Sequence, residues 1–271
     1  MLLSSAVFSL LIASAAMAEA PAGLRVPTGP WRVDFGDSAC VAERNYGTAE
    51  QPLMLVLKAP PIGDVMQIAV LRDARWTPAE PAEARVVIDG ASPLKTNLLM
   101  FTPKGAKQRV YLLNMPSTDF ARVRQAKLLA FRSSGLNEIF ALSGMQPLLK
   151  VMDDCVADLR RVWNIADATG AEAPALARRA SGNVARYFDD DDYPAAAVAS
   201  LQGGTVKFAM LVGEDGRVAD CTIIEPSGAA ELDGQACAIV RERAKFEPAR
   251  GKDGKPAKDA VLTSVRWVIP D

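Results

Sequence analysis

The sequence predicts an α+β protein in which a β-rich N-terminal domain, sandwich-like or barrel-like, precedes a small C-terminal domain. Short strand-like runs separated by Pro, Gly and Asp fill residues 31–114. Residues 164–186 change to Ala, Gly, Pro and scattered charge, which is typical of a linker. Strand, strand, helix and strand patterns then follow. We expect a signal peptide at 1–18, the β-rich domain at 19–163, the linker at 164–186 and the C-terminal domain at 187–271.

The composition excludes several classes of function. The 271 residues include 31 basic and 32 acidic side chains, so the net charge of -1 provides no field that attracts nucleic acid. The chain has no histidine, which is the usual general base near neutral pH and the commonest transition-metal ligand. The acidic run Asp189–Asp192 is interpreted as a solvated linker end, with calcium binding as the alternative. We therefore expect no enzymatic activity, no metal and no cofactor.

The N-terminus carries an export signal. Its apolar run ends in Ala16-Met17-Ala18, a small-residue pattern typical of signal peptide cleavage. We expect cleavage before Glu19 and a periplasmic protein. No Lys or Arg precedes the apolar run, so an uncleaved segment that anchors the protein in the inner membrane stays open as the alternative.

Four cysteines, Cys40, Cys155, Cys221 and Cys237, lie beyond this signal. An oxidising compartment favours disulfides between them. We prefer the pairings Cys40 with Cys155 and Cys221 with Cys237, because each bond then closes within one predicted domain. Four buried free thiols are the alternative.

The β-rich domain is expected to contain a series of strands and a closing helix. The strand-like runs are Trp31–Phe35, Cys40–Tyr46, Leu53–Lys58, Val65–Leu71, Ala84–Asp89, Asn97–Thr102, Arg109–Leu113 and, as a further candidate, Lys127–Arg132. The helix is expected to begin at a Ser143 cap and to pack on the sheet through Leu148, Met152, Cys155, Leu159 and Val162. Antiparallel sandwich and open barrel remain equally open topologies.

The C-terminal patterns are sharper. Thr205–Val212 alternates, an Asp-Gly turn follows at 213–216, and Arg217–Glu225 returns as the paired strand. A helix from Leu232 to Ala244 ends before Pro248, and Val261–Ile269 forms the last strand. Within the linker, we expect a short helix at Pro174–Arg179.

A set of short motifs in this region follows a known order and spacing. They are Tyr193-Pro194, a short helix from Ala195 to Leu201, Gly204-Thr-Val-Lys-Phe208, Asp215-Gly-Arg-Val218, Ser227-Gly228, Leu232-Asp233, the helix end Arg241–Lys245 and Phe246-Glu-Pro-Ala249. Together they resemble the TonB C-terminal domain. The resemblance implies a protein-binding module that catalyses nothing.

The resemblance also implies a binding mode. TonB domains bind an extended peptide, the TonB box of an outer-membrane transporter, along the edge of their last strand, which links them to transmembrane transport. Here the two faces of that strand carry Val261, Thr263, Val265, Trp267 and Ile269, and Leu262, Ser264, Arg266 and Val268. The residues expected to contact the partner are Val261, Leu262, Thr263, Ser264, Val265, Arg266, Trp267, Tyr193 and Pro194.

The chain departs from a full-length TonB. It shows no long Pro-rich and Lys-rich spacer, and its C-terminal domain has an extra cysteine pair. A linker of this length reaches only a few tens of ångströms, which argues against direct transmission of force from the inner membrane. An envelope scaffold that forms a homodimer therefore stays open as the alternative. The basic residues of 241–258 also leave contact with a cell-wall polymer open.

Overall fold

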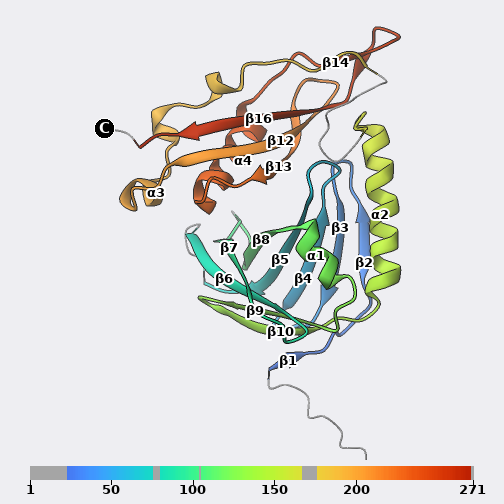
Figure 1. The fold of residues 1–271 in the computed structure, drawn as a ribbon, viewed down its shortest axis with the longest axis vertical. Coiled ribbons are helices and arrows are strands. Elements are labelled where there is room, and N and C mark those ends of the chain that lie inside the picture. Colours follow the sequence, from blue (N-terminus) through green and yellow to red (C-terminus); the bar gives the residue numbers. More distant parts are fainter. Residues whose placement is uncertain (1–22, 76–79, 104, 167–175, 270–271) are drawn as a thin grey trace, which may run out of the picture.

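The computed structural model of the protein describes residues 23–75, 80–103, 105–166 and 176–269. They form a large curled sheet with two α-helices, and a smaller sheet with α-helices of its own lies across one end of it (Figure 1). We call the described residues up to 166 the N-terminal unit and residues 176–269 the C-terminal unit. The expected signal peptide at 1–18 lies outside the described residues. No helix within these ranges is long and apolar enough to cross a membrane.

The N-terminal unit is built on one ten-stranded sheet that curls strongly (Figure 1). The strand order is β1-β10-β9-β6-β7-β8-β5-β4-β3-β2, and all neighbours are antiparallel except β1 and β10. β1 and β10 have no counterpart among the predicted runs. The strands are β1 (Leu24–Arg25), β2 (Arg32–Phe35), β3 (Cys40–Asn45), β4 (Leu53–Ala59), β5 (Val65–Asp73), β6 (Glu80–Ile88), β7 (Leu94–Phe101), β8 (Gln108–Pro116), β9 (Leu128–Ser133) and β10 (Leu136–Ala141).

Alternate side chains of these strands fill the inside of the curl. Leu55 and Leu57 of β4 and Ile68 and Val70 of β5 are buried there, two residues apart on each strand. Burial of such side chains stabilises the fold by about 1.5–3 kcal/mol each. The curled sheet therefore encloses a packed apolar core.

Helix α2 (Met145–Val162) packs beside β3, while the shorter α1 (Ser117–Val123) follows β8. The Cys40–Cys155 disulfide joins β3 to α2 with Cα atoms 6.2 Å apart, which is one of the preferred pairings. A strand and a helix distant in sequence are thus covalently fixed. The stabilisation expected from closing such a long loop is about 4–5 kcal/mol.

Two details of the predicted helix are wrong. The N-cap is Gly144, and the Ser143 hydroxyl instead accepts a hydrogen bond from Arg44 at 3.0 Å. Val162 is 51% exposed, because the buried stripe continues from Leu159 to Trp163, four residues on. The Trp163 indole donates to the carbonyl of Asp37 at 2.7 Å, which holds the helix end against the sheet.

The described part of the expected linker, from residue 176 onward, contains secondary structure. Leu176–Arg178 form β11, which pairs with β14 (Ala249–Gly251), so the short helix expected at Pro174–Arg179 is wrong in its described part. Two 3-10 helices follow, η1 (Val184–Tyr187) and η2 (Asp190–Asp192). Asp192 is buried and bonded to Arg243 of the C-terminal helix, so the acidic run is not simply a solvated linker end.

The C-terminal unit has the predicted order of strand, strand, helix and strand. Its main elements are α3 (Ala195–Ala199), β12 (Gly204–Val212), β13 (Val218–Glu225), α4 (Ala230–Arg243) and β16 (Asp259–Trp267), with a small hairpin of β14 and β15 (Pro256–Ala257) before β16. The antiparallel sheet has the order β13-β12-β16. α4 packs on one face over Phe208 and Met210, and the Cys221–Cys237 disulfide joins it to β13 with Cα atoms 5.5 Å apart.

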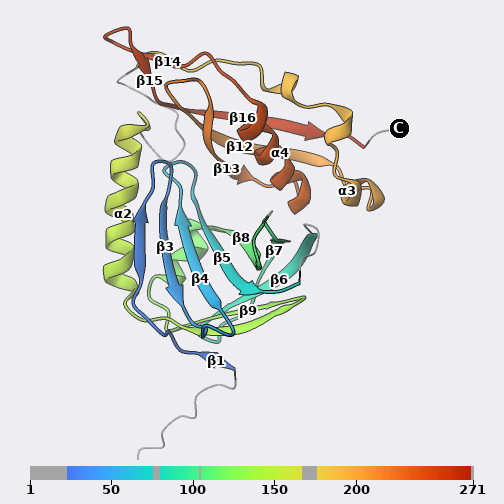
Figure 2. The same cartoon turned by 180° about the vertical axis from the view of Figure 1, so that it is seen from behind.

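The other face of this sheet packs on the N-terminal unit. Ala209, Leu211 and Ala260 are at most 2% exposed and belong to the same apolar cluster as the core of the curled sheet. The alternation expected over Thr205–Val212 therefore fails from Ala209 onward, since a strand covered on both faces needs apolar side chains throughout. Figure 2 shows the C-terminal unit lying across one end of the curled sheet.

Candidate functional site

Strand β16 is an edge strand of the C-terminal sheet. It pairs with β12 along its whole length, from Asp259 opposite Val212 to Trp267 opposite Gly204, without a bulge. Within the described ranges, no strand pairs with its other side. One row of backbone groups on β16 is therefore directed away from the sheet.

The hydrogen bonds of Ala260 identify which groups these are. Its N–H donates to the Asp259 carboxylate at 2.7 Å and its carbonyl accepts from Arg179 at 2.6 Å. Both backbone groups of Ala260 therefore point away from β12. Because antiparallel pairing alternates along a strand, the N–H and C=O groups of Leu262, Ser264 and Arg266 point the same way.

Arg179 and Asp259 close one end of this edge. Asp259 is fully buried, and it accepts hydrogen bonds from the Arg179 guanidinium at 2.9 Å and from the Ala180 N–H at 2.8 Å. Together they occupy the outward backbone groups of Ala260. The open part of the edge therefore begins at Leu262.

The two faces of β16 differ in exposure. Val261 and Val265 pack against the core beneath α4, and Trp267 is buried there. On the other face, Leu262 is 46% exposed, and Ser264 and Arg266 are exposed. A strand added to this edge would thus meet an accessible row of side chains on one face.

Aromatic side chains fix the far end of β16. The Trp267 ring lies edge-on between Phe188 and Tyr193, at centroid distances of 5.7 and 5.4 Å. The Tyr193 hydroxyl donates to the Gln202 carbonyl at 2.6 Å, and Pro194 precedes α3 as its N-cap. The structure thus places Tyr193 at the end of β16, where it supports Trp267.

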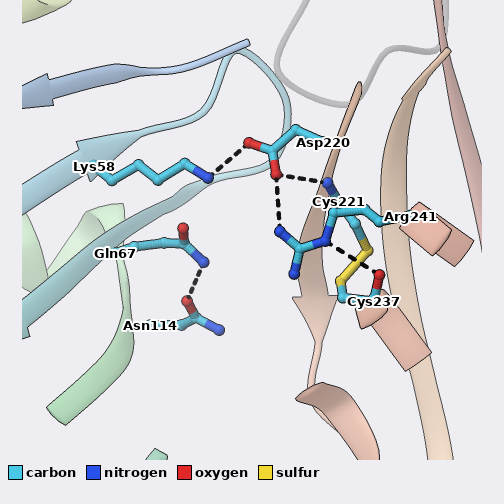
Figure 3. The surroundings of a disulfide bond; sticks show 7 residues. All are labelled: Lys58, Gln67, Asn114, Asp220, Cys221, Cys237 and Arg241. Carbon is cyan, nitrogen blue, oxygen red and sulfur yellow. Dashed lines mark hydrogen bonds and ion pairs between the residues drawn. A yellow bond between two sulfur atoms is a disulfide. The ribbon is translucent and has the colours of Figure 1, made fainter. Parts of the chain in front are cut away.

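An ion-pair cluster joins β13 to the N-terminal unit. Asp220, which is 4% exposed, accepts hydrogen bonds from Lys58 of β4 at 2.6 Å and from the Cys221 N–H at 2.8 Å (Figure 3). Arg241 of α4 approaches the same carboxylate at 3.5 Å, and its Nε donates to the Cys237 carbonyl at 3.2 Å. Burying this carboxylate is tolerable because partners from both units neutralise it.

A cavity of about 260 Å³ lies further along the same boundary. Its lining is mainly apolar and includes Leu113 and Met115 from β8 and Ile223 and Ile224 from β13. The N-terminal unit thus covers the β13 side of the C-terminal sheet and the start of β16 at Ala260, whereas the rest of β16 lies on the side of the sheet away from it (Figure 1).

Comparison with known families agrees with this geometry. Residues 190–269 match the family model described as the Gram-negative bacterial TonB protein C-terminal. This part of the chain is a TonB C-terminal domain. TonB C-terminal domains belong to a non-enzymatic family of envelope proteins that act through protein–protein interaction. Searches of the curated proteins and of the solved structures find no match to the chain.

Sequence reasoning located the edge of the TonB C-terminal domain but missed residues that shape it. Leu262, Ser264 and Arg266 lie together on the exposed face, as their two-residue spacing predicts. Arg179 and Phe188 were not predicted, because each contacts β16 from a segment distant in sequence. An acidic residue directly before an apolar strand, as at Asp259, is the one local signal of a capped edge.

Proposed function

We propose that the protein is a periplasmic envelope protein whose C-terminal unit binds an extended segment of a partner protein along β16. The partner strand would continue the antiparallel sheet by bonding the outward groups of Leu262, Ser264 and Arg266. The observation that supports this most directly is the open edge that starts beside the Arg179 cap. An exposed edge of this kind is a template for a further strand.

The family supplies the partner class. The TonB resemblance implies the TonB box of an outer-membrane transporter, so we propose that the protein serves transmembrane transport. The N-terminal unit would hold the TonB domain in a fixed orientation, because the two units share a core and an ion-pair cluster.

The experiment is an NMR titration of the full oxidised chain with TonB-box peptides. We expect saturable amide shifts concentrated on Leu262–Arg266. The variant Ser264→Pro should abolish binding, because proline removes an outward N–H that β12 does not use. Ser264→Ala is the matched control and should bind normally.

Three results would refute the proposal. One is saturable binding with shifts away from β16, and the second is unchanged binding by a folded Ser264→Pro variant. The third is a concentration-dependent dimer that protects β16 in the absence of peptide, which would favour a scaffold role.

A further inference from the structure

On the exposed face of β16, Arg266 is a cation for which the described part of the chain supplies no acidic partner. It forms no ion pair with any residue in the described ranges. The residue opposite it on β12 is the neutral Thr205. The next cation on this face, Lys207, is held by Glu225 of β13 at 2.8 Å. Arg266 is therefore available to a carboxylate that arrives from outside.

The other side chains in this row are apolar or small. Leu262 is 46% exposed and Val268 is 66% exposed, with Ser264 between Leu262 and Arg266. In sheets, directly opposite side chains on one face have Cβ atoms about 4.5–5.5 Å apart and interact in pairs. On β16 the row thus offers an apolar contact, a small polar position and a positive charge at alternate residues, and Val268 adds an exposed apolar side chain just beyond the end of the strand.

We infer that the preferred partner segment carries an acidic residue opposite Arg266 and an apolar residue opposite Leu262, both on one face of the added strand. This inference rests on the proposed function, since it names the chemistry that the β16 edge would select. The Arg179 cap sets the position of the segment, because pairing begins at Leu262. Arg266 then acts as a specificity-determining residue.

A second copy of the chain fits this edge less well. If two β16 edges paired antiparallel about Ser264, each Arg266 would lie opposite Leu262 of the other copy. A charge facing an apolar side chain gains no pairing energy and loses part of its hydration. The row therefore favours a partner segment with an acidic residue over self-pairing.

The test uses three short N-acetylated peptides in which Val and Thr alternate and one Val position carries Glu, Gln or Lys. Their dissociation constants are measured for the full oxidised chain, for Arg266→Glu and for Lys252→Glu. Lys252 lies on the exposed β14–β15 hairpin, so Lys252→Glu makes the same charge change away from β16.

We expect the wild-type chain to bind the Glu peptide about two- to fivefold more tightly than the Gln peptide, and the Lys peptide most weakly. Arg266→Glu should reverse the order, while Lys252→Glu should keep it. The difference should shrink at high salt, because the pair is exposed.

The outcomes separate the inference from the proposed function. If all three peptides bind at β16 and Arg266→Glu keeps the preference for Glu, another cation reads the charge and the inference is wrong. Equal binding of the three peptides by the wild-type chain also refutes it, with the proposed function intact. If no peptide, TonB boxes included, shifts the β16 amides, the proposed function fails and the inference fails with it.

Discussion

At the scale of single residues, the buried carboxylate of Asp192 shows how a polar group is kept inside the C-terminal unit. Two guanidinium nitrogens of Arg243 lie 2.8 Å from its two oxygens. Burial is the largest single effect, and it acts to raise the pKa of Asp192. The hydrogen bonds from Arg243 and from the Asp189 N–H, together with the positive charge of Arg243, outweigh burial and hold the pKa below its ordinary value of 3.8. A lowered pKa means that the contact stabilises the fold above pH 3.8 and is lost as the pH falls through the folded value.

We therefore predict that Arg243→Gln lowers the free energy of unfolding at neutral pH, because the Asp192 carboxylate stays buried without its guanidinium partner. The loss should shrink well below pH 3.8, where Asp192 is protonated in both states. Urea denaturation at neutral pH and at a pH well below 3.8 measures this loss in the free energy of unfolding. Arg161→Gln, which removes an exposed pair with Asp158, should cost no more than about 0.5 kcal/mol. An equal loss for Arg243→Gln at both pH values would contradict the electrostatic explanation.

At the scale of elements, two turns of the C-terminal unit repeat one pattern. Gly213-Glu-Asp-Gly216 and Gly251-Lys-Asp-Gly254 each place the aspartate side chain on the N–H two residues on, at 2.9 and 3.1 Å. Gly216 and Gly254 both have left-handed backbones, with φ of 80° and 77°. They differ in surroundings, because a Cβ on Gly216 would lie 2.1 Å from the Phe246 carbonyl, whereas one on Gly254 meets nothing within 4 Å.

This pair yields a matched prediction. Gly254→Ala should cost about 1–2 kcal/mol, the usual strain of a left-handed alanine. Gly216→Ala should cost about 1–3 kcal/mol more, since the Phe246 backbone must move. Thermal or chemical unfolding of both variants measures the difference. Equal losses would show that the close approach of Phe246 contributes nothing.

The sequence predicts where strands and helices lie better than it predicts which of them pack together. Strand runs such as Leu53–Lys58 follow from short apolar segments bounded by turn residues, whereas the pairing of β6 with β9 depends on residues far apart in the chain. The buried stripe of α2 was predicted to finish at Val162, whereas the structure buries Trp163 instead, because both residues are apolar and spacing alone does not choose between them. The two-residue period of a strand was enough to predict which side chains of β16 share a face. The contact of Arg179 with Ala260 could not be predicted in this way, because it depends on how the chain folds.

At the scale of the whole molecule, the two units behave as one body in the structure. The apolar run Ala209–Val212 is the sequence signal of a second covered face, although it does not identify the covering partner. Lys58 and Asp220 add a charged contact across the same boundary. We therefore expect the units to unfold together.

The corresponding prediction concerns Lys58→Met. It should lower the free energy of unfolding by about 1–3 kcal/mol, because Asp220 stays buried without its partner from the N-terminal unit. Hydrogen exchange should report the same loss in β5 and in β12. Lys150→Met removes an exposed pair with Asp154 and should change stability much less than Lys58→Met does. Separate unfolding of the C-terminal unit, unaffected by Lys58→Met, would show that the boundary does not couple the units.

The Arg179 cap on Ala260 has a consequence for the behaviour of the protein in a crowded compartment. Aggregation through edge strands requires long flat edges along which copies can slide and stack. Here Arg179 occupies the edge at Ala260, and Arg266 adds a charge among its outward positions. Only a short stretch of backbone remains accessible, so growth of fibrils from this edge is hindered at high concentration.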